Sequence, residues 1–267
     1  MPLHTSHQAP KHLPFAEAIN KVPEVTLVFW MIKILTTTVG ETGADYLAVH
    51  VGLGTALTGG IMGAALLVAL VAQLRSRRFL PWLYWLTVLL VSVVGTQITD
   101  ALTDGLGVSL HVSSAFFALC LASLFYIWFA VERTLSIRSI TSSRRELFYW
   151  GAVLFTFALG TATGDLATEA LGLGFELGSV IFALAIAAVA LGCRFGLDPV
   201  LGFWLAYILT RPLGASLGDW LSQARRYGGL GWGSSLTSLV FLAAIVALVV
   251  WTSGDSERGA QRQQDPT

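Results

Sequence analysis

The feature that most constrains the fold is a three-residue spacing that occurs four times along the 267-residue chain. A tryptophan is followed ten residues later by a glycine and fifteen residues later by an aspartate. The four sets are Trp30, Gly40 and Asp45; Trp85, Gly95 and Asp100; Trp150, Gly160 and Asp165; and Trp204, Gly214 and Asp219. Chance would produce this agreement on the order of once in a hundred million or less. The spacing therefore predicts four copies of one structural unit.

Each copy contains two long apolar segments. The chain is 55% hydrophobic and 12% charged, with a mean hydropathy of +0.70, whereas a soluble domain carries roughly 25% charged residues. Eight segments have the length of about 20 residues that a membrane-spanning helix needs. They lie at 23–46, 52–74, 80–102, 109–131, 147–168, 174–193, 199–221 and 231–251. We predict an all-α integral membrane protein of eight transmembrane helices.

The spacing also divides the chain into repeats. We place four two-helix repeats at 21–78, 79–138, 139–197 and 198–252, between polar tails at 1–20 and 253–267. We expect the C-terminal tail to be disordered because it is polar. Since every repeat crosses the membrane twice, all four enter it from the same side and should be parallel repeats around the membrane normal.

Basic residues indicate the orientation. Arginines cluster after the second and fourth spans, and Arg194 follows the sixth. Because cytoplasmic loops are enriched in lysine and arginine, these loops and both termini are predicted to be cytoplasmic. Arg225 and Arg226, in the last outer loop, run against this trend.

The second span of each repeat opens with small residues, such as Gly59 and Gly60. Small residues let helix backbones approach closely in lipid, and Gly59 with Gly63 forms a GxxxG pair. We therefore expect the even-numbered helices to be packing struts.

The opening unit resembles the first repeat of a known family. It runs Lys-Val-Pro-Glu-Val-Thr over residues 21–26, then Phe29-Trp30, Lys33, Thr-Thr-Thr at 36–38 and Gly-Glu-Thr at 40–42. This sequence resembles a bacterial membrane-protein family made of four tandem two-helix repeats of unknown function, over about residues 21–251. The resemblance implies an eight-span protein of the bacterial inner membrane, and it implies no activity.

Polar residues follow one stripe of each odd-numbered helix. Positions 3, 7, 11 and 15 after each repeat tryptophan lie along one helix face. The stripes are Lys33, Thr37, Glu41 and Asp45; Val88, Ser92, Thr96 and Asp100, followed by Asp104; Val153, Phe157, Thr161 and Asp165, followed by Glu169; and Tyr207, Arg211, Ala215 and Asp219. A charge at the bilayer centre costs at least about 2.5–3.5 kcal/mol. We expect the odd helices to turn these stripes toward one another.

Lys33, Glu41 and Arg211 are the charges predicted to lie deepest. Lys33 lies about 15 Å along its helix, near mid-membrane, and Arg211 occupies the seventh position of the fourth stripe, beside Pro212. Buried charges of opposite sign normally pair. We expect Glu41 to pair with Lys33 or Arg211, either as a structural bridge or as a pair that a substrate or proton can break.

The four repeat aspartates are predicted near the outer membrane boundary, where a helix C-terminus disfavours negative charge. Two explanations are open. A cation, most specifically a divalent metal ion, would be bound by Asp45, Asp100, Asp165 and Asp219; or the helices would break at Gly40, Gly95, Gly160 and Gly214 and free backbone carbonyls for an ion. His50 and His111 are candidate ligands near this layer, and His4, His7 and His12 form a loose cluster in the N-terminal tail.

The preferred functional hypothesis is a transporter or permeation pathway for a small cation, lined by the odd helices. Transport of a divalent metal ion coupled to protons is its more specific form, with the metal as substrate, and the sequence identifies no cofactor. The zero net charge predicts no nucleic-acid binding, and no nucleotide-binding, metalloprotease or serine-nucleophile motif is present. Two alternatives stay open: an intramembrane enzyme or redox partner acting on an amphiphilic substrate, and a structural or sensory scaffold. The sequence leaves a homo-oligomer open.

Overall fold

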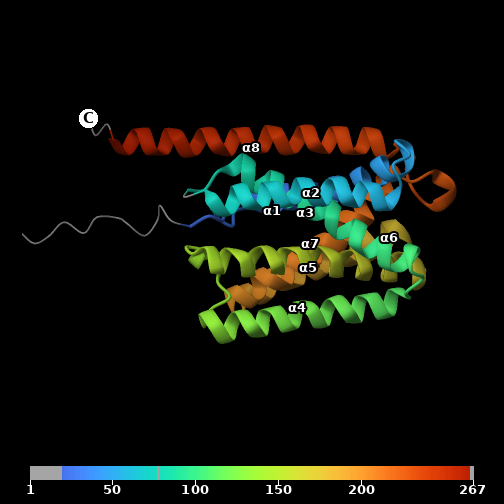
Figure 1. Cartoon of the computed structure of the whole chain (residues 1–267), viewed down its shortest axis with the longest axis horizontal. Coiled ribbons are helices and arrows are strands. Elements are labelled where there is room, and N and C mark those ends of the chain that lie inside the picture. Colours follow the sequence, from blue (N-terminus) through green and yellow to red (C-terminus); the bar gives the residue numbers. More distant parts are fainter. Residues whose placement is uncertain (1–19, 77, 265–267) are drawn as a thin grey trace, which may run out of the picture.

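The computed structural model describes residues 20–76 and 78–264, with side chains described up to residue 253. These residues form eight long helices joined by short turns (Figure 1). The helices are α1 (Leu27–Asp45), α2 (Gly54–Arg75), α3 (Pro81–Asp100), α4 (Leu110–Glu132), α5 (Ser143–Asp165), α6 (Gly174–Arg194), α7 (Pro199–Ser222) and α8 (Ser234–Gln264). The all-α prediction is confirmed, and the helices match the eight predicted segments closely except that α8 extends beyond residue 251.

Seven of the eight helices in the described chain are long and apolar enough to cross a membrane. The exception is α1, which has the length of the others but carries Lys33, Glu41 and three consecutive threonines at 36–38. α1 is therefore the one described helix that does not qualify as a membrane span by its own composition, and its polar residues rely on neighbouring helices for burial.

Local sequence explains where the helices begin. Thr26, Ser109 and Ser142 each accept a hydrogen bond from a backbone N–H in the first turn that follows, as N-cap residues do. Asp198 accepts two such bonds at the start of α7. Pro81 and Pro199 occupy first helical positions, where a proline costs no backbone hydrogen bond.

Three odd helices change geometry at their repeat aspartate. A π-helical turn follows directly at Tyr46–His50 (η1), Ala101–Gly105 (η2) and Leu166–Ala170 (η4). π-helical turns are rare in proteins, and those that occur often lie at functional sites. The fourth odd helix differs, because α7 continues as α-helix past Asp219 to Ser222.

The odd helices form an inner ring. α1 packs against α3, α3 against α5, α5 against α7, and α7 closes the ring against α1. Each even helix packs outside this ring on the odd helix of the following repeat: α2 on α3, α4 on α5, α6 on α7, and α8 back on α1. The first described residues and the end of α8 lie at the same end of the bundle (Figure 1).

The repeat glycines are the crossing points of the inner ring. A Cβ added to any of them would collide with the residue seven after the tryptophan of the next repeat. The four contacts are Gly40 with Ser92, Gly95 with Phe157, Gly160 with Arg211, and Gly214 with Thr37. Close crossings also bring carbonyls within reach, so Thr38 donates to the Gly214 carbonyl at 3.0 Å and Thr99 to the Ala158 carbonyl at 3.1 Å.

One of the two open explanations for the repeat aspartates, a helix break at the repeat glycines, is excluded. The odd helices are not broken at the repeat glycines, because each helix continues through its glycine and uses it to approach a neighbour. The GxxxG pair of α2 forms no close crossing either: nothing lies within 4 Å of a Cβ placed on Gly63, and the nearest atom to one on Gly59 is the Gln97 Cβ at 3.7 Å. Close packing by glycine is found mainly between the inner helices, and on the outer helices at Gly178 of α6, where an added Cβ would lie 2.7 Å from Thr168 and 3.3 Å from Ser216.

The tails lie largely beyond the described side chains. The expectation of disorder from residue 253 is wrong as far as residue 264, because α8 continues to Gln264. Helix-favouring residues such as glutamate, arginine, alanine and glutamine in this stretch support the extension. The predicted cluster of His4, His7 and His12 lies outside the described residues.

Candidate functional site

The interior of the inner ring is lined by the predicted stripes. Positions 3, 7 and 11 of the four stripes are buried, apart from Glu41, which is partly exposed. Buried polar members include Lys33, Thr37, Ser92, Thr96 and Thr161. The odd helices therefore turn their polar faces toward one another, as the cost of a polar group in lipid requires.

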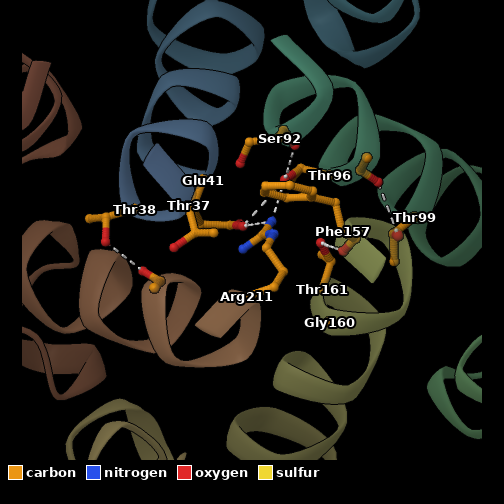
Figure 2. Close-up of polar contacts among 12 residues, drawn as sticks. Thr37, Thr38, Glu41, Ser92, Thr96, Thr99, Phe157, Gly160, Thr161 and Arg211 are labelled. Atoms are coloured by element: carbon orange, nitrogen blue, oxygen red, sulfur yellow. Dashed lines mark hydrogen bonds and ion pairs between the residues drawn. The ribbon is translucent and has the colours of Figure 1, made fainter. Parts of the chain in front are cut away.

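An ion pair crosses this interior between the first and last repeats. Arg211 of α7 donates from Nη2 to Glu41 Oε2 of α1 at 2.6 Å, and to Thr96 Oγ1 of α3 at 2.5 Å (Figure 2). The Thr96 hydroxyl also lies 3.4 Å from the same Glu41 oxygen. The sequence left Lys33 and Arg211 as possible partners of Glu41, and in the structure the partner is Arg211. One contact thus joins three of the four repeats.

Lys33 occupies a different environment. Its side chain is buried, and in the described part of the chain its Nζ has no hydrogen-bond partner. The nitrogen lies 4.1 Å from the ring centroid of Phe157 and 4.4 Å from that of Tyr207. Lys33 therefore contacts the π faces of two aromatic rings, an arrangement that the sequence did not suggest.

Carboxylates gather at one end of the interior, which we call the acidic mouth. It consists of Glu41 with the four repeat aspartates, Asp104 and Glu169. Asp100, Asp165 and Asp219 are half-buried, whereas Asp45, Asp104 and Glu169 are exposed. Each repeat aspartate, and Glu169, is close enough to Glu41 to interact with it electrostatically. The four aspartates therefore surround the charge at the base of the mouth.

The acidic mouth does not contain a ready-made metal site. Within residues 20–76 and 78–264, no three His, Cys, Asp or Glu side chains form a group that could hold a metal ion. His50 is exposed and its Nδ1 lies 3.3 Å from the Ser234 hydroxyl; His111 is exposed as well. Metal binding by the four aspartates stays a prediction.

The opposite end is closed by aromatic side chains. The residue before each repeat tryptophan packs against the tryptophan of the next repeat, with ring centroids 5.4 to 6.2 Å apart. These pairs are Phe29 with Trp85, Tyr84 with Trp150, Tyr149 with Trp204, and Phe203 with Trp30. The hydroxyls of Tyr84 and Tyr149 are hydrogen-bonded at 2.5 Å. We call this layer the aromatic floor, and it gives the repeat tryptophans a packing role.

A second ion pair is located at this closed end. Lys21, ahead of α1, lies 2.6 Å from Glu146 in the first turn of α5 and donates to the Leu74 carbonyl of α2 at 3.2 Å. Sequence analysis did not find this pair, because Glu146 lies outside the repeat spacing and Lys21 lies before the first predicted helix, where a lysine is normally exposed.

The fold and this interior define a class: an all-α protein of four two-helix repeats whose first helices enclose a charged, polar core. The chain belongs to the family described as Repeat of Unknown Function (DUF347), whose matches cover residues 28–79, 83–134, 148–194 and 202–253. Each match covers an inner helix and the outer helix that follows it in sequence. No curated protein and no solved structure matches the chain.

Proposed function

We propose that this chain is an integral membrane protein that transports a small cation through the interior of the inner ring. The observation that carries the proposal is the position of the Glu41–Arg211 pair at the base of the acidic mouth. The Glu41 side chain is 16% exposed, whereas that of Arg211 is 0% exposed. Glu41 can therefore be reached by a cation from the mouth while its partner is held in the interior.

The charge distribution supports cation entry. A concave surface lined by charges of one sign raises the local concentration of the opposite ion. Seven carboxylates at this end of the interior, against one arginine that is already paired, give a local charge that favours cations. An entering cation would compete with Arg211 for Glu41, which is the type of replaceable pair expected along an ion path.

The remainder of the interior favours a carrier over an open channel. Below the ion pair, Phe157, Tyr207 and the tyrosines of the aromatic floor are fully buried. A cation would need these side chains and the inner helices to move before it could leave at the other end. Transporters of repeat architecture achieve such movement by rocking one group of helices against another around a central site.

We further propose a bacterial inner-membrane location with both chain ends in the cytoplasm. Seven helices of the described chain have the length and composition of membrane spans, and Arg75, Arg78, Arg133 and Arg194 lie at the end of the bundle with the aromatic floor. This orientation directs the acidic mouth to the outside. If the cation is a divalent metal ion, the carboxylates of the acidic mouth must move together when it binds, because no group of three such ligands is in place among the described residues.

The test is cation flux into liposomes containing the purified protein, with a panel of monovalent, divalent and alkylammonium ions and with or without a pH gradient. Glu41→Gln should reduce flux at least tenfold, because it removes the charge for which cargo and Arg211 compete. Glu176→Gln is the matched control, since Glu176 is an exposed carboxylate on the outer helix α6.

Absence of flux for every ion, from protein that remains folded, would contradict the transport proposal and favour a scaffold. Equal flux in the Glu41→Gln and wild-type proteins would remove Glu41 from the path. Retention of a lipid-like molecule on purification would favour the enzyme alternative.

A further inference from the structure

The Lys33 ammonium group is buried without a carboxylate partner among the described residues, and it lies over two aromatic rings. Within the described residues, the only other charged side chains that are buried are Arg211 and Glu146. Arg211 already holds Glu41, and Glu146 lies at the opposite end with Lys21. The faces of Phe157 and Tyr207 are therefore the groups that contact the Lys33 nitrogen. An aromatic face attracts a cation, and the attraction is stronger when both are removed from water.

The repeat itself shows that this site is not required by the fold. The position three after the tryptophan is Val88 in the second repeat and Val153 in the third, and both are buried. The first and fourth repeats place Lys33 and Tyr207 at that position. Lysine and tyrosine thus stand at a position where valine also packs. The Lys33 nitrogen lies 4.4 Å from the ring centroid of Tyr207.

The site also adjoins the proposed cation path. The guanidinium carbon of Arg211 lies 5.9 Å from the same Phe157 ring that Lys33 contacts at 4.1 Å. Figure 2 shows the Phe157 ring at the centre of the inner ring, beside the Glu41–Arg211 pair. A cation that displaced Arg211 from Glu41 would meet this ring next.

We propose that Phe157 and Tyr207 form a cage for the ammonium group of the transported molecule, and that the Lys33 head group occupies this cage in the present structure. The inference rests on the proposed transport function and specifies its cargo as an ammonium-type cation, such as a short primary alkylammonium ion. A hard divalent metal ion requires several oxygen ligands, which two aromatic faces do not supply. Lys33 is thus a tethered equivalent of the cargo, and it must leave the cage when cargo enters.

The test is chemical rescue of a truncated lysine in the purified full-length protein. Lys33→Ala removes the head group and its alkyl chain, whereas Lys33→Met fills the same space with an apolar side chain. n-Butylammonium chloride should raise the melting temperature of Lys33→Ala by several degrees, in a concentration-dependent manner, because a ligand that binds only the folded state stabilises it. It should leave Lys33→Met unchanged, and 1-butanol should give Lys33→Ala no comparable rise.

Phe157→Leu in the Lys33→Ala background should abolish the rescue, since it removes one face of the cage. Equal shifts with n-butylammonium and 1-butanol would show simple cavity filling and overturn the cage. A third outcome would also reject the cage: Lys33→Met folds, but Lys33→Ala does not fold even when the amine is present during expression and purification.

The rescue and the flux measurement can fail separately. Rescue without flux of any cation would keep the cage and contradict transport. Flux that depends on Glu41, together with no rescue and with unchanged methylammonium uptake in Phe157→Leu, would keep transport and overturn the cage.

Discussion

The inner and outer rings of helices reverse the usual relation between polarity and burial. The outer helices α2, α4, α6 and α8 are the most apolar, yet they expose large side chains such as Leu67, Leu184 and Leu239. The inner helices carry the threonines and the charges and are mostly buried. Because lipid tails are as apolar as leucine, burial of apolar surface cannot hold helices together in a membrane; small residues and polar contacts do so. The two rings therefore derive their stability from different interactions.

The largest effect should come from the Glu41–Arg211 pair, the ion pair of the inner ring, in which the Arg211 side chain is fully buried. Removing one partner of a buried pair costs about 3–5 kcal/mol of unfolding free energy, because it leaves the other charge uncompensated. Arg211→Met and Glu41→Gln should each lower the detergent melting temperature strongly, and the double variant should lose much less than their sum.

Lys33→Met provides the control for this cycle, since Lys33 and Glu41 are not paired in the structure. Its effect should add to that of Glu41→Gln. Additive losses for Arg211 and Glu41, with coupling between Lys33 and Glu41 instead, would contradict the pairing shown in Figure 2.

A smaller change in the free energy of unfolding should distinguish inner-ring glycines that contact a neighbouring helix from those that do not. Gly160→Ala would place its Cβ against the Cβ and Cγ of Arg211 and near the Pro212 ring, so overpacking should cost about 1–3 kcal/mol. Gly43→Ala, on α1, meets no atom within 4 Å. It should stabilise its helix by up to about 1 kcal/mol, as alanine does in a helix interior. Chemical denaturation in mild detergent measures both, and equal losses would remove the crossing role of Gly160.

The smallest effect should come from the outer ring. Leu239→Ala truncates a side chain of α8 that is 66% exposed, and the free energy of unfolding should change by no more than about 0.5 kcal/mol. The same measurement in detergent and in lipid bicelles checks it. A large loss in either would mean that α8 contacts a second copy of the chain or another partner at this face.

Much of the architecture could be predicted from the sequence because the membrane and the repeat restrict it. Apolar length placed the eight helices, and the cost of charge in lipid placed Lys33, Glu41 and Arg211 in the interior. Sequence could not choose between Lys33 and Arg211 as the partner of Glu41, since both lie on suitable faces and only the packing of α7 against α1 decides. It also left open whether the helices break at Gly40 and its equivalents, because a glycine in a helix fits a break and a close crossing equally well.

The aromatic contacts of Lys33 illustrate the remaining gap. Phe157 and Tyr207 lie on different helices from Lys33, and although Tyr207 shares the repeat position of Lys33, Phe157 lies four residues further along its own repeat, so the spacing does not predict that the three meet. Their departure from the residues at equivalent positions of other repeats was the available signal.

The packing of α8 on α1 sets a condition on the order of synthesis. α1 precedes the other seven described helices in the chain, and it is the one of the eight that does not qualify as a membrane span by its own composition. Two of the helices that pack on α1, α7 of the inner ring and α8 of the outer ring, come last among the described helices. Until they arrive, Lys33 and Glu41 lack part of their final surroundings, so α1 must wait at the insertion machinery, or at the membrane edge, through most of translation. A circularly permuted chain that begins at α7 would shorten this delay and should insert with a higher yield.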